Sequence, residues 1–490
     1  MVERFKSLVL ALLVITSFVL TFKIALNEKL WPDGYNFFVD SRFSSVADLA
    51  SKLNPFAKSG TGNASNSVLT VPNRVIVNAG GEQRYYITNK NSQHDAVDYQ
   101  VKRILTALFS SLDVGTAADD AEVASALKTK SVYLDYITSY DTGVFAQYMN
   151  KNDSTVARSV SKFSGMIVSF SDTVKTNATV YIKDIQTNRY FKFDIPYAKA
   201  DFDTIFKNIQ NDEENLISYS ADLGYDKKVE GQRILIESAV PIFLEPVEVN
   251  EIKGENPVLK ANNEYDDNVI YKILRTFKIN PNTYNKYTEA DETMVFVENN
   301  ATLKIHKNGV VEYNAKPGVP GIELVKQNAS SFETMLAVSE FIDAVSKSAG
   351  IYHPLMQSPA YNDSVLRGAD MQMRFDYLVN NTAVMINLSG GKSNPEVDNS
   401  VFVQMQSGAI TKYIHLLRRY DNTENKVDTA LVDKSLDAVF EQYRGNNADG
   451  IFISNIYPVY KYDDKTETFI AQWNINVDKV EINESEPSQE

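Results

Sequence analysis

The chain has 490 residues, a formal net charge of -14 and no cysteine. The acidic balance argues against a nucleic-acid-binding surface, and the lack of cysteine excludes disulfides, thiolate metal sites and cysteine nucleophiles. Hydrophobic residues make up 43% of the chain, which is enough for packed cores rather than general disorder. At roughly 150 residues per domain, we expect about three domains after the N-terminal segment.

The N-terminus combines a short basic start with an apolar run. Arg4 and Lys6 precede a segment, residues 7–26, that approaches the ~20 residues needed to cross a bilayer. A removable signal peptide would have a shorter apolar core, of roughly 7 to 15 residues, and small residues at a cleavage site. We therefore expect a transmembrane signal anchor over residues 7–26, with residues 1–6 in the cytoplasm and the bulk of the chain outside the cytoplasm.

Small residues form a stripe along this expected helix. At 100° per residue the stripe covers about 120° of arc, with Leu8, Leu12, Ile15 and Val19 largely on other sides. Small side chains allow helices to approach closely in lipid, although they are also frequent in membrane helices that have no partner. The stripe is the candidate transmembrane interaction face, and it consists of Ser7, Ala11, Ser17, Thr21 and Ala25.

A spacer and a first α+β domain are expected next. Residues 27–67 include a run rich in Ser, Gly and Asn, which is typical of a linker. For the N-terminal domain, 68–198, we predict helices at 96–112 and 119–128 and a hairpin turning near Thr187-Asn188-Arg189. Its strands are expected at residues 68–77, 83–88, 131–137, 164–170, 178–183 and 190–195.

The middle domain, 199–350, is also expected to be α+β. It should open with a helix whose apolar face carries Phe202, Ile205, Phe206 and Ile209, followed by a strand at 233–244. An antiparallel meander is indicated by Asn308-Gly309, because Asn-Gly is a strong hairpin signal. The meander strands are expected at 293–298, 301–306 and 310–313, and a helix capped by Ser330 or Ser331 should follow at 331–345.

The C-terminal domain, 351–482, repeats this order of a meander and a helix. We predict strands at 371–377, 383–388, 400–405 and 410–417, a helix at 431–443, and a closing hairpin of 451–462 with 466–477. The fold class is therefore α+β: a transmembrane helix, then an elongated multi-domain region whose later two domains share an antiparallel β-meander plus helix. This is a weak structural repeat over about 230–350 and 355–482. The tail, 483–490, is expected to be disordered.

Histidine and glycine-rich motifs give no sign of a metal or nucleotide site. His94, His306, His353 and His415 are widely separated and lack zinc-ligand spacing, so each is expected to be a surface or partly buried side chain. The run Ser389-Gly-Gly-Lys-Ser393 lacks the first glycine of a phosphate loop and is interpreted as a β-turn. We expect no catalytic, cofactor-binding or metal-binding residues.

Four acidic clusters leave hydrolysis open as an alternative. Paired carboxyl groups ~5 to 9.5 Å apart could hydrolyse a glycoside, but the sequence does not give that distance. The clusters fall at expected helix starts, loops and turns, where solvation and the helix dipole favour acids. They are residues 119–120, 212–214, 266–267 and 463–464.

Several stretches resemble the YycH proteins of low-GC Gram-positive bacteria. They are the apolar run from Ser7 to Thr21, Leu30-Trp31-Pro32 just after the expected anchor, the stretch from Leu303 to Tyr313, and the C-terminal stretches 456–460 and 469–473. The resemblance covers nearly the whole chain in layout but only short stretches in detail. The chain departs from the pattern by inserting residues 23–29 between Phe22 and Leu30, and by its long spacer.

The resemblance implies a non-enzymatic regulator in the cell membrane. Proteins of this family have one membrane helix and a large extracytoplasmic part, and control the WalK sensor histidine kinase together with the companion protein YycI. The resemblance thus implies WalK-type and YycI-type partners, contacted through membrane helices, and no cofactor. The alternatives are a membrane-anchored cell-wall hydrolase and a module that binds a wall-derived ligand.

Overall fold

The computed structural model describes residues 72–80, 84–87, 93–170, 176–209, 216–223, 227–229, 232–280, 284–358, 365–386, 397–429, 431–443, 450–463 and 468–480. The chain separates into two compact units, residues 1–60 and 61–490, and every described residue belongs to the second. The expected anchor (7–26), spacer (27–67) and tail (483–490) lie outside the described residues. None of the helices within the described ranges is long and apolar enough to cross a membrane.

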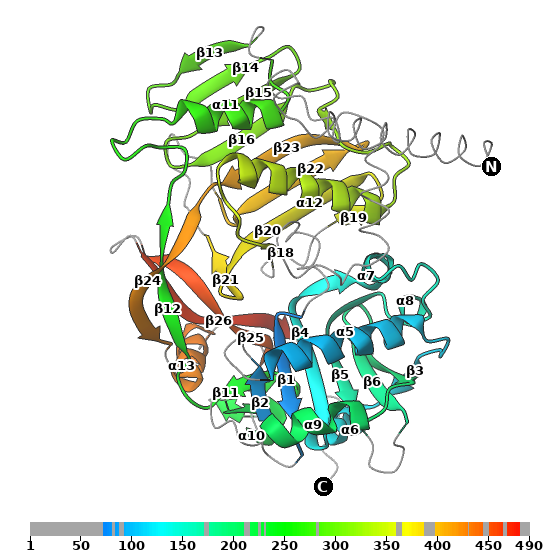
Figure 1. Cartoon of the computed structure of the whole chain (residues 1–490). Helices are drawn as coiled ribbons and strands as arrows, with labels where there is room; N and C mark the ends of the chain where they lie inside the picture. Colours follow the sequence, from blue (N-terminus) through cyan, green and yellow to red (C-terminus); the bar gives the residue numbers. More distant parts are fainter. Residues whose placement is uncertain are drawn as a thin grey trace, which may run out of the picture. The chain divides into compact units, whose positions relative to one another are not determined.

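A nine-stranded antiparallel sheet holds the first part of the described chain (Figure 1). Its strand order is β11-β8-β2-β1-β4-β5-β6-β7-β3. The strands are β1 (Arg74–Asn78), β2 (Arg84–Ile87), β3 (Thr116–Ala118), β4 (Ser131–Asp141), β5 (Lys162–Ser169), β6 (Ala178–Asp184), β7 (Arg189–Ile195), β8 (Leu216–Tyr219) and β11 (Pro241–Phe243). The predicted hairpin forms between β6 and β7 and turns through Asn188, which has a positive φ of 54°.

Helices cover this sheet because their apolar residues recur at helical spacing. α5 (His94–Ser110) and α9 (Ala200–Ile209) lie side by side (Figure 1), and Phe202 of α9 packs 5.6 Å from Phe170. α6 (Asp120–Lys128) packs through Val123 and Leu127 against Ile76 and Ile167. The shorter helices of this part are α7 (Thr142–Tyr148), α8 (Val156–Ser159) and α10 (Ser220–Leu223).

A second strand network is built around two meanders. The first is β13 (Asn285–Thr288), β14 (Met294–Val297), β15 (Ala301–Ile305) and β16 (Val310–Ala315); the second contains β20 (Asp370–Val379), β22 (Val401–Gln406) and β23 (Ala409–Leu416). They join where β16 pairs antiparallel with β23, with Tyr313 opposite Tyr413. The short strands β17 (Ile322–Glu323), β18 (Leu355–Gln357), β19 (Val365–Arg367) and β21 (Thr382–Met385) complete the edges.

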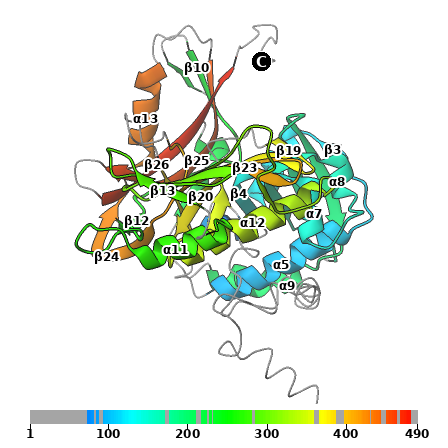
Figure 2. The same ribbon diagram turned by 90° about the horizontal axis from the view of Figure 1, so that it is seen from above.

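Two helices cover one side of these joined meanders (Figures 1 and 2). They are α11 (Asp267–Thr276) and α12 (Ser331–Ser348), and α12 begins with a capping box of Ser330 and Glu333. Their last turns meet, because Thr276 Oγ1 lies 2.8 Å from Ser348 Oγ. Beneath them, Phe277 packs 5.3 Å from both Phe341 and Tyr413.

Long strands connect the two parts of the described chain. β25 (Gly450–Asp463) and β26 (Thr468–Val480) form the predicted C-terminal hairpin, and α13 (Val432–Tyr443) packs against β26. β12 (Glu248–Glu255) pairs with β24 (Arg419–Asp428), and β25 also pairs in parallel with β10 (Gln232–Ile236) and β21. β9 (Lys227–Val229) pairs with β10.

The structure differs from the predicted elements at several points. The strand predicted at 233–244 is two strands in different networks, β10 and β11, because the chain turns at 237–240, where Val240 N donates to Glu237 O at 3.0 Å. β12, α11 and β24 were not predicted. The first sheet also continues past residue 198 into β8 and β11. The domain boundaries at 198/199 and 350/351 stay predictions.

The described part is therefore α+β, with large antiparallel sheets and nine helices among its residues. This confirms the α+β fold class in its coarse form.

Candidate functional site

The predicted transmembrane interaction face cannot be located, because Ser7, Ala11, Ser17, Thr21 and Ala25 all lie outside the described residues. The same holds for residues 389–393 and for the acidic cluster 212–214. Two other acidic clusters have structural roles: Asp119 caps α6 by accepting from Glu122 N at 2.7 Å, and Asp266 caps α11 by accepting from Asn268 N at 2.9 Å. Asp463 ends β25 opposite Thr468, and residue 464 lies outside the described residues.

The four histidines belong to separate segments: the start of α5, the turn between β15 and β16, the segment before β18, and β23. His94 is partly exposed at the start of α5, His306 and His415 are buried, and His353 Nε2 accepts a hydrogen bond from Tyr420 N at 3.0 Å. Burial lowers the pKa of His353. In the described ranges, no group of three or more His, Asp and Glu side chains is placed to hold a metal ion.

A buried Tyr-His-Tyr cluster lies under α12 in the second meander. The hydroxyl of Tyr377 is 2.5 Å from His415 Nε2, and the hydroxyl of Tyr413 is 2.7 Å from His415 Nδ1. A neutral imidazole has one donor and one acceptor nitrogen, so one tyrosine donates and the other accepts. Burial lowers the pKa of His415 to about 3, which keeps the ring neutral. The cluster satisfies buried polar groups and has a structural role.

A polar cleft of about 240 Å³ opens between the first sheet and the β25–β26 hairpin. One wall comes from β4 to β7, the other from β25, β26 and the turn before β11. We define the cleft by eight residues that carry its chemistry: Tyr133, Tyr181, Lys183, Tyr190, Glu237, Phe452, Asn455 and Asn476. Its volume lies slightly below the range of about 300 to 1,000 Å³ that is usual for ligand pockets.

The ammonium group of Lys183 lies on one side of the cleft and is paired with a carboxylate of the protein. Lys183 Nζ forms an ion pair with Glu237, and the side chains are 24% and 18% exposed. Glu237 Oε1 also accepts a hydrogen bond from the Tyr190 hydroxyl at 3.0 Å. Burial is the main cause that raises the pKa of Tyr190, so this hydroxyl stays protonated and donates to the carboxylate. This side of the cleft is polar and has little net charge.

A buried ion pair organises both walls of the cleft. Arg74 pairs with Asp135, donates from Nη1 to the carbonyl oxygen of Ile456 at 2.6 Å, and donates from Nη2 to Asn455 Oδ1 at 2.8 Å. Asp135 Oδ1 in turn accepts from the backbone N of Ile137 at 2.9 Å. Arg74 of β1 therefore fixes a bulge in β4 and the amide of Asn455 in β25.

The bulge in β4 places backbone strain beside the cleft. The pairing of β4 with β5 jumps from Asp135 opposite Gly165 to Tyr140 opposite Phe163. Ile137, inside the jump, lines the cleft with φ of 60°, which is rare for a β-branched residue and costs about 1 to 3 kcal/mol. Such strain persists where surrounding contacts enforce it, and it is found often at functional sites.

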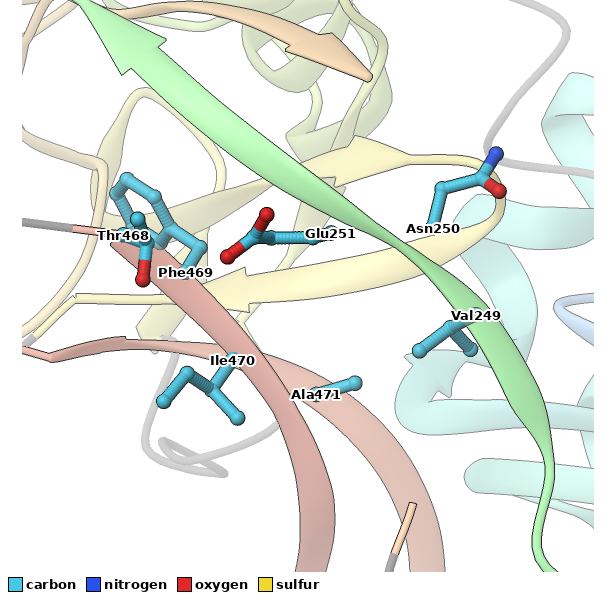
Figure 3. Close-up of a pocket in the computed structure, with 7 residues that line it drawn as sticks. All are labelled: Val249, Asn250, Glu251, Thr468, Phe469, Ile470 and Ala471. Atoms are coloured by element: carbon cyan, nitrogen blue, oxygen red, sulfur yellow. The ribbon is translucent and has the colours of Figure 1, made fainter. Parts of the chain in front are cut away.

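A second, more apolar groove of about 220 Å³ lies between β12 and β26. These strands are bridged only at Ile252 and Phe469 among their described pairings. Figure 3 shows the side chains of Val249, Ile470 and Ala471 in the space where the strands diverge. The carboxylate of Glu251 is engaged by β24, since it accepts from Thr423 Oγ1 and Asn425 Nδ2 at 3.0 Å each. We assign no function to this groove.

Comparison with known proteins identifies the fold. No protein-family model and no curated protein matches the sequence. Among solved structures, YycH from Bacillus subtilis aligns with a TM-score of 0.52 and 11% identity, covering 85% of this chain and 96% of that chain. The chain has a YycH-like fold. An uncharacterized protein from Eubacterium rectale aligns with a TM-score of only 0.34, at 14% identity, covering 58% of this chain and 92% of that chain.

The YycH-like fold confirms the resemblance proposed from the sequence. It also contains a site that the sequence analysis missed, because the polar cleft is lined by residues from distant segments of the chain, such as Lys183 and Asn455. One local signal was present: Arg74 directly precedes the apolar run Val75-Ile76-Val77, and Asp135 lies between Leu134 and Tyr136, and charges beside such residues are buried only when paired.

Proposed function

We propose that this protein is a non-enzymatic, membrane-anchored regulator of a WalK-type sensor histidine kinase that responds to the state of the cell wall. The observation that carries the proposal is the YycH-like fold over 85% of the chain. The apolar N-terminal segment and the stretch Leu30-Trp31-Pro32 support it independently, because the family resemblance there was seen in the sequence.

The proposed location is the cell membrane, with a single span. Residues 7–26 would be the anchor, residues 1–6 would lie in the cytoplasm, and the remainder would lie outside it. The length and hydrophobicity of the segment and the basic residues Arg4 and Lys6 support this arrangement.

Regulation would act through contacts between membrane helices. The stripe of Ser7, Ala11, Ser17, Thr21 and Ala25 would pack against the kinase or against a YycI-type companion with one span. A helix that binds one packing state of the kinase more tightly than the other shifts the kinase between them, by an amount set by that difference in affinity. The outer part would tune or localise the anchor.

The non-enzymatic character is supported by how the candidate chemical groups are used. Asp119 and Asp266 cap helices, and His415 is enclosed by two tyrosines. Each of these residues has a structural role that accounts for its position.

We also propose that residues 230–350 and 355–482 are two copies of one architectural unit. In each unit a meander is followed by a helix, β14 to β16 by α12 in the first and β20 to β23 by α13 in the second. The last strands of the two meanders, β16 and β23, pair antiparallel. This pairing fits two units related by an approximate two-fold axis.

Substitutions on the two sides of the anchor test the regulatory role. Replacing Ala11 and Thr21 by Phe fills the stripe, so we expect the kinase or the companion to be lost from the co-purified complex and phosphorylation of the response regulator to resemble that in a deletion strain. Leu12→Phe with Val19→Phe is the matched control, because it adds the same rings on another side. Unchanged co-purification and unchanged phosphorylation in the Ala11→Phe/Thr21→Phe protein would contradict the proposal.

A further inference from the structure

Two asparagines face each other on the β25–β26 hairpin at the cleft. Asn455 and Asn476 are register partners, so their side chains are neighbours on the same face of the hairpin. Both line the cleft, and both are partly exposed. The sequence separates them by a complete strand and turn, so their pairing is created by the fold.

Hydrogen bonds fix how each amide is oriented. Asn455 receives hydrogen bonds from Arg74 Nη2 and from Ile456 N, both at 2.8 Å, and both partners are donors only. The atom that they contact must therefore be the amide oxygen. Asn476 Oδ1 accepts from Asn474 Nδ2 at 2.9 Å, and the same nitrogen of Asn474 also donates to the Tyr457 hydroxyl at 2.7 Å.

The amide nitrogens are consequently the groups that remain to bind a ligand. Asn455 Nδ2 donates no hydrogen bond among those of the described residues, whereas the amide of Asn476 also donates to the Tyr457 hydroxyl. Each Nδ2 carries two N–H groups, so Asn476 keeps one N–H for a ligand and Asn455 keeps two. A carbonyl oxygen, which accepts two hydrogen bonds, matches this pair of donors.

The opposite wall offers aromatic surfaces, and Glu237, in the turn before β11, offers an acceptor. Tyr133, Tyr181 and Tyr190 line it, and aromatic rings bind flat, weakly polar surfaces. Glu237 can accept hydrogen bonds from ligand hydroxyls while it holds Lys183. An anionic ligand is disfavoured, because the charge of Lys183 is already balanced by Glu237 and the protein carries a net charge of -14.

We propose that the polar cleft binds one residue of a neutral N-acetylated sugar. The acetamido carbonyl would accept from Asn455 and Asn476, a face of the sugar ring would lie against tyrosine, and ring hydroxyls would donate to Glu237. The cleft volume of about 240 Å³ suits a group of this size and leaves the rest of a glycan outside. The inference goes beyond the proposed regulation of the kinase and does not depend on it.

Binding of a disaccharide to the purified full-length chain tests the inference. The probe is N,N′-diacetylchitobiose, and its binding is measured by calorimetry in a detergent without a sugar headgroup. Cellobiose is the matched control ligand, because it lacks the acetamido groups. We expect saturable binding of the first and at least tenfold weaker binding of the second, a difference of about 1.4 kcal/mol. No binding of the first, or equal binding of both, would overturn the inference.

Amide-to-acid substitutions locate the binding site. Asn455→Asp and Asn476→Asp each keep the oxygen that accepts the internal hydrogen bond but remove the Nδ2 donors, so each should weaken binding at least tenfold. Gln472→Glu is the matched control, because it makes the same change at an exposed position of β26 and should leave binding unchanged. Unchanged affinity in both asparagine variants, or preferential binding of an acidic peptide, would overturn the assignment.

These experiments test sugar binding at the cleft independently of kinase regulation. Asn476→Asp keeps the test valid if Asn455→Asp fails to fold, because the oxygen of Asn476 contacts only Asn474 in the hydrogen bonds of the described residues. The binding assay does not involve the kinase, so a negative result in it does not affect the proposed function. A negative result with the anchor substitutions does not affect the proposed sugar site.

Discussion

Arg74 and Asp135 form an ion pair between β1 and β4 in which each side chain is only 2% exposed. The same guanidinium reaches β25 through Ile456 and Asn455, which belong to the C-terminal hairpin. One arginine therefore links the first sheet to the distant strand β25, since Arg74 and Asn455 are 381 positions apart. This network determines the geometry of the polar cleft.

We predict that Arg74→Met strongly destabilises the fold. The substitution leaves the carboxylate of Asp135 buried without its cation, which typically costs about 3 to 5 kcal/mol. Urea unfolding measures this loss. Arg103→Met is the control. Arg103 pairs with Asp201, but their side chains are 42% and 36% exposed, so this ion pair should contribute at most about 1 kcal/mol to stability. Equal losses in both variants would show that the buried network is not important for stability.

We predict that Gly408→Ala costs more stability than Gly318→Ala. Both glycines have positive φ, 83° and 76°, so each alanine suffers a backbone penalty of roughly 1 to 2 kcal/mol. At Gly408 a Cβ would also lie 2.2 Å from the carbonyl oxygen of Val325, whereas at Gly318 no atom lies within 4 Å among the described residues. Thermal unfolding should show the larger decrease for Gly408→Ala, and equal decreases would refute the steric account.

We predict that His415 makes the fold less stable as the pH falls below about 6.5. Its pKa is lowered from 6.5 to about 3 by burial, so the unfolded chain binds the proton first. The neutral ring makes its full contribution to the free energy of unfolding above the pKa of histidine in the unfolded chain. As the pH decreases from there to about 3, this contribution decreases by up to about 1.4 kcal/mol per pH unit. The destabilisation by His415→Gln, measured in urea at several pH values, should therefore shrink on acidification.

The exposed His94 provides the control for this measurement. His94→Gln makes the same substitution at a side chain that is 39% exposed, so it shows the effect of removing a histidine outside the core. A pH-independent effect of His415→Gln would mean that the Tyr-His-Tyr cluster tolerates the charged ring.

We predict the opposite sign for Asp376. Burial raises its pKa from 3.8 to about 6, so the folded protein keeps a proton that the unfolded chain has lost. Stability therefore falls as the pH rises through this window, by about 3 kcal/mol in total. Asp376→Asn stays neutral and can still accept from Ser400 N, so its stability relative to the unmodified protein should increase from pH 4 to pH 7. A constant difference would contradict the account.

Local signals in the sequence predicted the elements whose geometry is set by near neighbours. The turn at Asn308-Gly309 forms as expected, with Gly309 at φ of 86°, and Ser330 caps α12. α11 was missed although its signal was present: Asp266 is an N-cap, and Val269, Ile270, Ile273 and Leu274 have helical spacing. These local signals are sufficient to predict α11.

Other features could not be predicted from local patterns. β24 has a polar sequence without apolar alternation, because most of its described side chains are exposed. The pairing of β16 with β23, and the meeting of Asn455 with Lys183 across the cleft, depend on contacts between distant segments. The anchor that carries the proposed regulatory face lies outside the described residues, so its candidate residues stay predictions.

The most direct test is phosphorylation of the response regulator in the native host. It compares a deletion strain with strains carrying the full chain, residues 1–35 alone, or residues 67–490 alone. We expect the full chain and residues 1–35 to shift phosphorylation in the same direction, because the proposed regulatory contacts lie in the anchor. If no version changes phosphorylation relative to the deletion, the protein does not regulate this kinase.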